Sequence, residues 1–273
     1  MAIIIGDIHG DLAMTRAFLA YKPEVEHVSL GDIVDSRDPL TTFDEELACL
    51  DLLLDSGCAL VWGNHDLAYT PKRPWGDFTR HLFVKDSEVP RWVDGKEYLT
   101  RLYSENEYGK LYYRDIFESR YHVAREKGQI KAAHAAGGWL CTHAGVSTEL
   151  AAALPSAPWD SGDPLIIASW ICEEFEREFA ISRDHFHDPP VDLNGVGPLF
   201  FIAATRAGDD PFGGIFWFDS RREGLNPDPR FKQIFGHTMT EGPMRKGNHV
   251  NIHIEDGWWV FDTETEGFVR LGP

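Results

Sequence analysis

Short apolar runs that end in glycine and polar residues recur through the first third of the chain. Residues 2–5, 27–30 and 58–62 form such runs, and their length is typical of strands buried in a parallel sheet. Between them, residues 12–19 and 42–54 have the apolar spacing of helices. The pattern therefore predicts a βαβαβ unit.

A polar turn follows each of these predicted strands, at residues 6–11, 31–35 and 63–66. In open α/β sheets, ligands bind outside the carboxyl ends of the strands. We therefore expect the three turns to lie side by side at one edge of the sheet.

The chain changes character between residues 69 and 137, where charged and aromatic side chains are frequent. A helix is expected at residues 105–125, and no strand is evident in this stretch. We interpret residues 69–137 as a cap inserted into a single domain that spans residues 1–273. Substrate specificity is expected to lie in this cap.

Apolar runs followed by polar residues return in the second half of the chain. They predict strand-and-turn units within residues 138–145, 199–206 and 231–238. The last two runs, residues 250–254 and 258–261, are separated by a short polar turn and predict a β-hairpin.

Composition narrows the classes of partner. Among 273 residues, 26 Lys and Arg face 44 Asp and Glu, which gives a net charge of −18. Such a surface repels duplex nucleic acid, and a phosphorylated substrate would need a local positive site. No apolar run approaches the length of a membrane span or a signal peptide, and the four cysteines form no CxxC pair. We therefore expect a soluble, cytoplasmic protein with no membrane partner.

Five polar motifs stand where strands are predicted to end, and they contain carboxylate, amide and imidazole groups. The motifs are Asp7-Ile8-His9, Gly31-Asp32-Ile33-Val34-Asp35, Gly63-Asn64-His65-Asp66, Thr142-His143-Ala144-Gly145 and Gly236-His237-Thr238. These donors suit manganese, iron or zinc. A single ion would leave donors over, whereas two ions bridged by one carboxylate would use all six of Asp7, His9, Asp32, Asn64, His143 and His237.

Two such ions would also supply the positive site that a phosphorylated substrate needs. Their four positive charges exceed the two negative charges of the ligating aspartates. Paired divalent ions deprotonate a bridging water and stabilise both oxygens of an in-line displacement at phosphorus. The donor set therefore favours hydrolysis of a phosphate ester.

The motif set resembles the calcineurin-like metallophosphoesterases. It is most similar to their phosphoprotein phosphatase branch and its bacterial relatives, including symmetrical diadenosine tetraphosphate hydrolases. The motifs extend from Asp7 to His237 in the family's order. The resemblance implies an α/β fold, a four-layer α/β/β/α sandwich, with a dimetal site at one end.

The same resemblance implies a role for each motif residue. Asp7 and His9 would hold the first metal, Asp32 would bridge, and the second metal would be held by Asn64, His143 and His237. His65 would act as general acid and Asp35 would orient it, as a carboxylate holds an imidazole in the required tautomer.

Two departures from the family pattern bear on the substrate and the metals. In the phosphatase branch an Arg usually follows the second Asp of the second motif directly, but here Ser36 intervenes before Arg37, a candidate phosphate clamp. Other branches end in Gly-His-x-His, whereas Met239 occupies the last position here, which favours the phosphatase-like branch. Arg206 resembles a substrate-binding Arg of dinucleotide polyphosphate hydrolases, and Asn64 is a further candidate for substrate binding.

Two other polar clusters are interpreted without a metal. Residues 184–188, Asp-His-Phe-His-Asp, precede two prolines and are expected to form an exposed loop. His249, Asn251 and His253 alternate on one face of a predicted strand, and a partly solvated face is favoured over a third metal site.

The sequence thus predicts a phosphoesterase with two divalent transition metal ions, of which manganese is favoured over iron or zinc. A metal-bridging hydroxide would attack phosphorus and His65 would protonate the leaving group. Substrates would be phosphorylated small molecules, nucleotides or phosphoproteins. The alternatives are a phosphodiesterase and a non-catalytic, metal-stabilised binding module, although a structural metal site would not need the His65–Asp35 pair.

Overall fold

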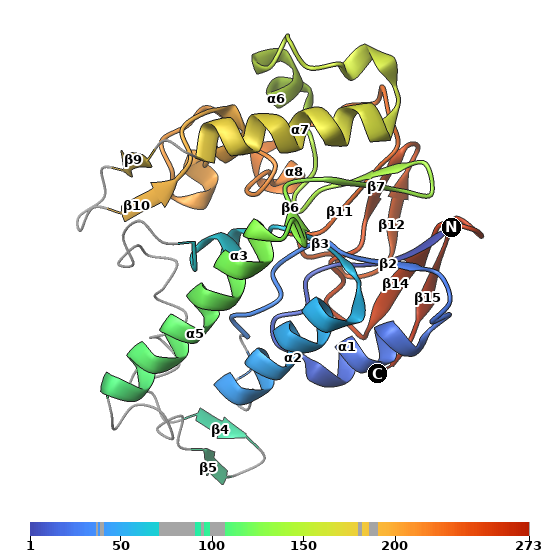
Figure 1. Ribbon diagram of the computed structural model, residues 1–273. Helices are drawn as coiled ribbons and strands as arrows, with labels where there is room; N and C mark the ends of the chain where they lie inside the picture. Colours follow the sequence, from blue (N-terminus) through green and yellow to red (C-terminus); the bar gives the residue numbers. More distant parts are fainter. Residues whose placement is uncertain are drawn as a thin grey trace.

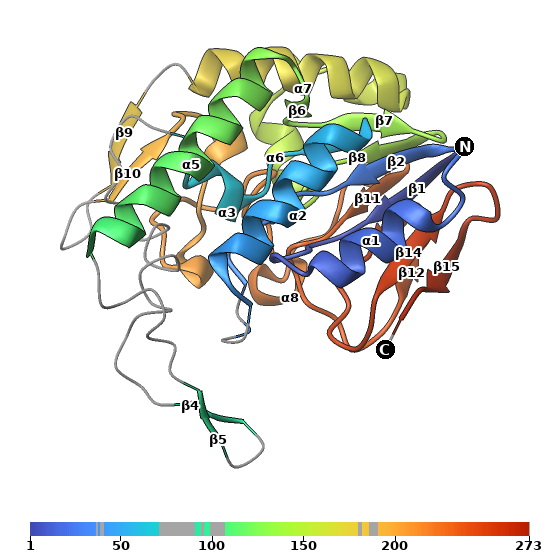
Figure 2. The same ribbon diagram turned by 60° about the horizontal axis from the view of Figure 1, so that its bottom comes forward.

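Two β-sheets lie face to face, with helices on the outer side of each (Figures 1 and 2). The computed structural model describes residues 1–36, 38, 41–70, 91–93, 96–98, 107–179, 182–185 and 191–272. Among these residues, no helix is both long enough and apolar enough to cross a membrane.

The first sheet has six strands in the order β15-β14-β1-β2-β3-β6. Their bounds are β1 Ala2–Ile5, β2 Glu26–Ser29, β3 Ala59–Val61, β6 Ile130–Lys131, β14 Trp259–Asp262 and β15 Gly267–Arg270. β1, β2, β3 and β6 are parallel neighbours, and β14 pairs antiparallel to β1. The predicted βαβαβ unit therefore forms the centre of this sheet.

The second sheet has five strands in the order β12-β13-β11-β8-β7. Their bounds are β7 His134–Ala136, β8 Trp139–Cys141, β11 Gln233–Phe235, β12 Met244–Lys246 and β13 His249–Asn251. β8 and β13 both run parallel to β11. Two short antiparallel pairs stand apart from the sheets, β4 Arg91–Val93 with β5 Lys96–Tyr98 and β9 Ser182–His185 with β10 Val191–Asn194.

Helices form the two outer layers. Their bounds are α1 Leu12–Ala20, α2 Phe43–Ser56, α3 Asn64–Leu67, α5 Glu107–Glu126, α6 Thr148–Ala153, α7 Pro164–Phe179 and α8 Ser220–Glu223. Short 3₁₀ helices occur at Trp159–Ser161, Pro198–Phe200 and Ala204–Arg206. In Figure 2, α1, α2 and α5 lie next to one another in front of the first sheet, and α7 packs on β7 and β8 of the second.

β1 shows why its apolar run is continuous. Ile3 and Ile5 belong to the core under the helices, whereas Ala2 and Ile4 belong to the core between the two sheets. Successive strand residues point to opposite faces, so a strand covered on both faces needs apolar residues throughout. The expected α/β/β/α sandwich is confirmed.

Local sequence signals set the ends of α1 and α2. The side chain of Asp11 accepts a hydrogen bond from Met14 N and begins α1. Thr42 and Glu45 form a reciprocal capping box that begins α2, and Gly57 in the left-handed conformation ends it.

The predicted C-terminal hairpin is wrong. β13 lies in the second sheet and β14 in the first, so the segment between them crosses from one sheet to the other. The hairpins formed instead are β12–β13 and β14–β15. Periodicity identified strands here, but strand pairing depends on contacts that are remote in sequence.

Two further expectations about strands are also wrong. Residues 199–206 form two 3₁₀ turns around Phe201–Ala203 rather than a strand. The stretch 69–137 contains strands, and its last two, β6 and β7, belong one to each main sheet.

Of residues 184–188, Asp184 and His185 lie in β9, and the other three fall outside the described residues.

Candidate metal centre

The five polar motifs meet at one place, where the carboxyl ends of parallel strands from both sheets come together. Backbone hydrogen bonds join the loops: His9 N donates to Asp32 O at 2.8 Å, and Gly236 N donates to His143 O at 2.6 Å. The backbone N–H of His237 donates to Asp7 Oδ1 at 3.0 Å. Contacts between motifs thus hold the loops in position.

Glycines allow this close approach. A Cβ on Gly63 would lie 2.2 Å from both the backbone N and Oδ1 of Asp32, and one on Gly31 would lie 2.3 Å from Gly63 N. A Cβ on Gly236 would lie 2.3 Å from Asp7 Oδ1. Gly31, Gly63 and Gly236 are therefore required because the loops approach one another too closely to leave room for a Cβ.

Backbone strain is concentrated at the same site. His9, Asp32, Asp35 and His237 all have positive φ angles, between 49° and 64°. Left-handed conformations are costly for residues with a Cβ and persist where surrounding contacts enforce them, often at functional sites.

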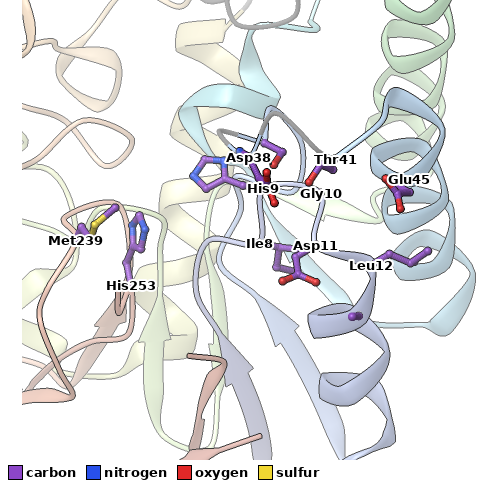
Figure 3. Close-up of a pocket in the computed structure, with 12 residues that line it drawn as sticks. Ile8, His9, Gly10, Asp11, Leu12, Asp38, Thr41, Glu45, Met239 and His253 are labelled. Atoms are coloured by element: carbon purple, nitrogen blue, oxygen red, sulfur yellow. Dashed lines mark hydrogen bonds between the residues drawn. The ribbon is translucent and has the colours of Figure 1, made fainter. Parts of the chain in front are cut away.

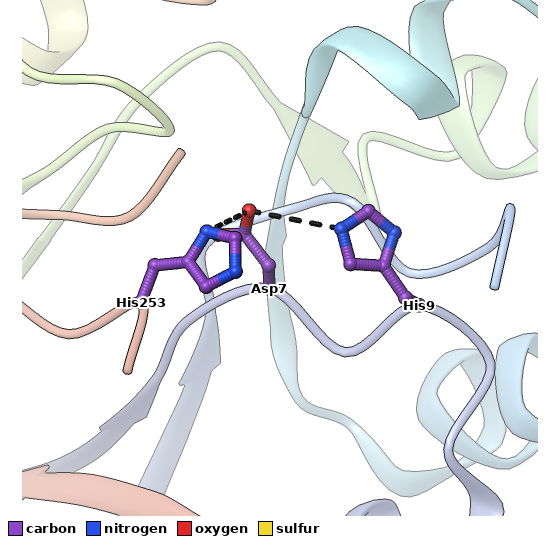
Figure 4. Close-up of side chains that lie close together, drawn as sticks. All are labelled: Asp7, His9 and His253. Atoms are coloured by element: carbon purple, nitrogen blue, oxygen red, sulfur yellow. Dashed lines mark ion pairs between the residues drawn. The ribbon is translucent and has the colours of Figure 1, made fainter. Parts of the chain in front are cut away.

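The first cluster of potential ligands contains Asp7, His9 and His253 (Figure 4). Asp7 Oδ2 lies 2.7 Å from His253 Nδ1 and 3.9 Å from His9 Nε2. Burial alone would raise the pKa of the Asp7 carboxyl, but His253 beside it holds this pKa well below its ordinary value. Asp7 is therefore an anionic donor.

The second cluster contains Asp32, His143 and His237, with Asn64 beside them. His143 Nε2 lies 2.9 Å from Asn64 Oδ1, 3.2 Å from His237 Nδ1 and 3.4 Å from Asp32 Oδ2. Burial lowers the pKa of both His143 and His237. Both imidazoles are therefore held neutral, the form that binds a metal.

Asp32 lies between the two clusters. Its Oδ1 accepts a hydrogen bond from the backbone N–H of His65 at 2.9 Å. Its Oδ2 lies 3.9 Å from His9 Nε2 and 3.4 Å from His143 Nε2. Burial, followed by the negative charge of Asp7, raises the pKa of Asp32 well above its ordinary value. A cation beside Oδ2 would relieve that repulsion.

The tautomers of two histidines agree with metal binding. His9 Nδ1 lies 3.2 Å from Val34 O, and His143 Nδ1 lies 2.8 Å from Leu30 O. A neutral imidazole that donates its Nδ1–H to a carbonyl directs a lone pair from Nε2, as metal-binding histidines commonly do. Both Nε2 atoms face Asp32 Oδ2, which is itself an acceptor.

This arrangement fits divalent cations. His143 Nε2, Asn64 Oδ1 and Asp32 Oδ2 are acceptors that converge in a buried place, where a cation satisfies them together. Buried His237 Nε2 has no hydrogen-bond partner among the described residues. The donors match the expected set of carboxylate, amide and imidazole groups.

His65 and Asp35 form the expected pair next to the clusters. His65 Nδ1 lies 3.1 Å from Asp35 Oδ2, and the two side chains are almost completely buried. The rings of His65 and His9 meet edge to face with centroids 5.1 Å apart. Asp35 does not cap α2, because Thr42 does.

Of the two candidate arginines, Arg206 lies near the second cluster. Its Nη2 donates to buried Asp219 Oδ2 at 2.7 Å, and its positive charge contributes, after burial and His143, to lowering the pKa of His237. Arg37 falls outside the described residues.

A pocket of about 490 Å³ opens beside the first cluster (Figure 3). His9, His253 and Met239 line one part of it, and the loops that precede α1 and α2, with the first turns of these helices, line the rest. Among the described lining residues, the carboxylates are those of Asp11, Asp38 and Glu45.

The structure brings together all six of the predicted ligands and adds His253. The expectation of a partly solvated strand face is wrong for Asn251, which is fully buried. His253 is partly exposed, as expected, but its ring also contacts Asp7. The sequence does contain one relevant signal: Met239 stands where other branches supply a second histidine, and His253 occurs 14 residues later.

Comparisons with known proteins were made for sequence and for structure. No curated protein sequence matches the chain. One similar solved structure is a protein serine/threonine phosphatase from Saccharomyces cerevisiae with similarity to human phosphatase PP5, at 15% identity and a TM-score of 0.43. The match covers 92% of this chain and 65% of that one. Residues 2–241 match the calcineurin-like phosphoesterase family, and the chain therefore belongs to that family.

Proposed function

We propose that this protein is a phosphoesterase that uses two divalent metal ions to hydrolyse a phosphate ester. The observation that carries the proposal is the position of Asp32 Oδ2, which lies 3.9 Å from His9 Nε2 of the first cluster and 3.4 Å from His143 Nε2 of the second. A carboxylate oxygen aimed between two donor clusters is suited to bridge two ions.

Each cluster then has a defined ligand set. Asp7, His9 and His253 would hold the first ion, and Asn64, His143 and His237 the second, with Asp32 shared. Manganese, iron and zinc all suit these donors. When bound, a pair of such ions supplies an activated water and positive charge for the phosphoryl oxygens.

The chain's own residues supply the remaining chemistry. His65, oriented by Asp35 through Nδ1, would deliver a proton to the leaving oxygen, because such an oxygen departs more readily when protonated. Arg206 is held by Asp219 near the second cluster and would bind a phosphoryl oxygen. Asn64 and Arg37 remain further candidates for substrate contact.

The pocket beside His9 and His253 is the proposed place for the leaving group. A leaving group with additional phosphates would bring negative charge towards Asp11, Asp38 and Glu45, which is unfavourable. The pocket therefore favours phosphomonoesters, including phosphopeptides, over diadenosine tetraphosphate.

The direct test is metal content together with hydrolysis. We expect purified protein to bind about two equivalents of manganese and to hydrolyse p-nitrophenyl phosphate in its presence. His65→Asn should lower kcat for phenyl phosphate, whose leaving oxygen is basic, by about 100-fold or more while retaining both ions, because His65 contributes a proton and no metal bond. Phosphopeptides and diadenosine tetraphosphate, assayed alongside, would determine the substrate class.

Two results would contradict the proposal. Less than one equivalent of bound metal, with no manganese-stimulated hydrolysis, would rule out the dimetal phosphoesterase. Two tightly bound ions with no hydrolysis of any phosphate ester in the panel would instead support the metal-stabilised binding module. Preferential cleavage of bis(p-nitrophenyl) phosphate would identify a phosphodiesterase.

A further inference from the structure

Tyr69 lies behind the His65–Asp35 pair, in a position that none of the five motifs includes. Its hydroxyl donates a hydrogen bond to Asp35 Oδ1 at 2.5 Å, while the other carboxylate oxygen, Oδ2, faces His65 Nδ1 at 3.1 Å. Each oxygen of Asp35 thus has its own side-chain donor. The carboxylate cannot rotate without breaking one of these contacts.

The hydroxyl of Tyr69 is fixed as a donor. Burial, followed by the negative charge of Asp35, raises the pKa of Tyr69 well above its ordinary value, so the phenol keeps its proton. The side chain is fully buried, and no water is needed to complete the hydrogen bond.

Helix α5 determines where the Tyr69 ring lies. Phe117 of α5 packs against it with ring centroids 5.3 Å apart, and Tyr121, one turn later, stacks on it at 5.9 Å with an interplanar angle of 19°. Phe117 and Tyr121 are themselves fully buried. Helix α5, which lies in the stretch expected to form a cap, therefore contacts Tyr69, the residue that donates to Asp35.

We propose that Tyr69 is a positioning residue, whose hydroxyl holds the Asp35 carboxylate in the orientation that aligns His65 for proton delivery, and that α5 fixes Tyr69 for this task. The inference rests on the proposed function, because it assumes that His65 protonates the leaving oxygen. It goes further in connecting α5 to the reaction.

Tyr121 provides a matched control. Its hydroxyl also donates at 2.5 Å to a buried aspartate of the loops, but that aspartate is Asp66, which accepts from the backbone N–H groups of Ile33 and Gly63. Tyr69→Phe and Tyr121→Phe thus each remove one buried hydroxyl from the same aromatic stack. Only the first removes a donor from the His65–Asp35 pair.

The test compares leaving groups. Proton delivery matters for phenyl phosphate, whose leaving oxygen is basic, and much less for p-nitrophenyl phosphate, whose leaving oxygen departs as a stable anion. Tyr69→Phe should lower kcat for phenyl phosphate by about three- to tenfold more than for p-nitrophenyl phosphate. Tyr121→Phe should leave this ratio as in the unaltered protein, and both variants should retain their metal.

Two further measurements separate positioning from a structural effect. In the Asp35→Asn background, Tyr69→Phe should no longer change the ratio, because the group that it positions is already altered. In zinc-loaded protein with labelled histidines, NMR should detect the hydrogen-bonded Nδ1–H of His65, and Tyr69→Phe should weaken this signal while Tyr121→Phe preserves it.

The outcomes distinguish this inference from the proposed function. If His65→Asn shows the leaving-group dependence but Tyr69→Phe lowers both rates equally, Tyr69 has only a structural role and the inference is wrong. If His65→Asn itself shows no such dependence, the general-acid role fails and the inference fails with it.

Discussion

His253 reaches the first cluster from the segment that crosses between the two sheets. The carbonyl of His253 accepts a hydrogen bond from Thr240 N at 2.9 Å, and its own N–H donates to buried Asn251 Oδ1 at 2.9 Å. These contacts fix the backbone on both sides of the ring that touches Asp7. The segment lies beyond residue 241, where the family match ends.

We predict that His253→Ala weakens the first metal site. Removing a direct donor should lower manganese affinity at that site by about 100-fold. In a titration followed by electron paramagnetic resonance, the signal of two coupled ions should give way to that of one. His249→Ala, four residues earlier and in β13, is the control and should retain both ions. An unchanged coupled signal in His253→Ala would remove His253 from the ligand set.

At the scale of elements, α2 supports the second motif from behind. Glu46, fully buried on α2, accepts hydrogen bonds from the backbone N–H groups of Asp35 at 2.9 Å and Ser36 at 3.2 Å. The loop that carries Asp35 in a left-handed conformation is therefore held by a helix side chain.

We expect Glu46→Gln to destabilise the protein by about 1–3 kcal/mol. The amide replaces one of the two acceptor oxygens with an NH₂ group, so one of the two buried backbone N–H groups loses its acceptor. Thermal melts should show the loss, and kcat should fall because the Asp35 loop is released. Asp55→Asn changes an exposed residue of the same helix and should alter stability by no more than about 0.5 kcal/mol. Equal effects of the two substitutions would contradict the role assigned to Glu46.

At the scale of the whole molecule, acidic side chains outnumber basic ones, which gives a net charge of −18. Some of these acidic side chains are buried. Glu178, near the end of α7, is 5% exposed and accepts a hydrogen bond from Leu199 N at 3.2 Å. Burial, reinforced by Glu174, raises the pKa of Glu178 to about 8. The folded protein therefore binds this proton more tightly than the unfolded chain does.

Stability should consequently fall with rising pH because of Glu178. Its contribution is complete below the unfolded value near 4.5 and is lost as the pH rises through about 8. In metal-free protein, we expect the melting temperature of Glu178→Gln to fall less than that of the unaltered protein between these values. Glu173→Gln, on an exposed position of α7, should follow the unaltered protein. Parallel curves for all three proteins would contradict the raised pKa.

Prediction from the sequence succeeded where the physical cause is local. The apolar run Ala2–Ile5 and the helical spacing of residues 42–54 each express a requirement of a single strand or helix, and these elements form as expected. The donor types of the motifs likewise indicate a metal, because ligand chemistry is a property of the side chains themselves.

Only the tertiary structure decided which distant residues meet. Whether the run after Asn251 turns back as a hairpin or crosses to β1 depends on which strand offers a free edge, and the crossing is what brings His253 to Asp7. Tyr69 likewise contacts Asp35 because α5 packs against it. The sequence by itself determined the chemistry of the site and the elements that carry it, whereas packing between elements remote in the chain determined its complete set of residues.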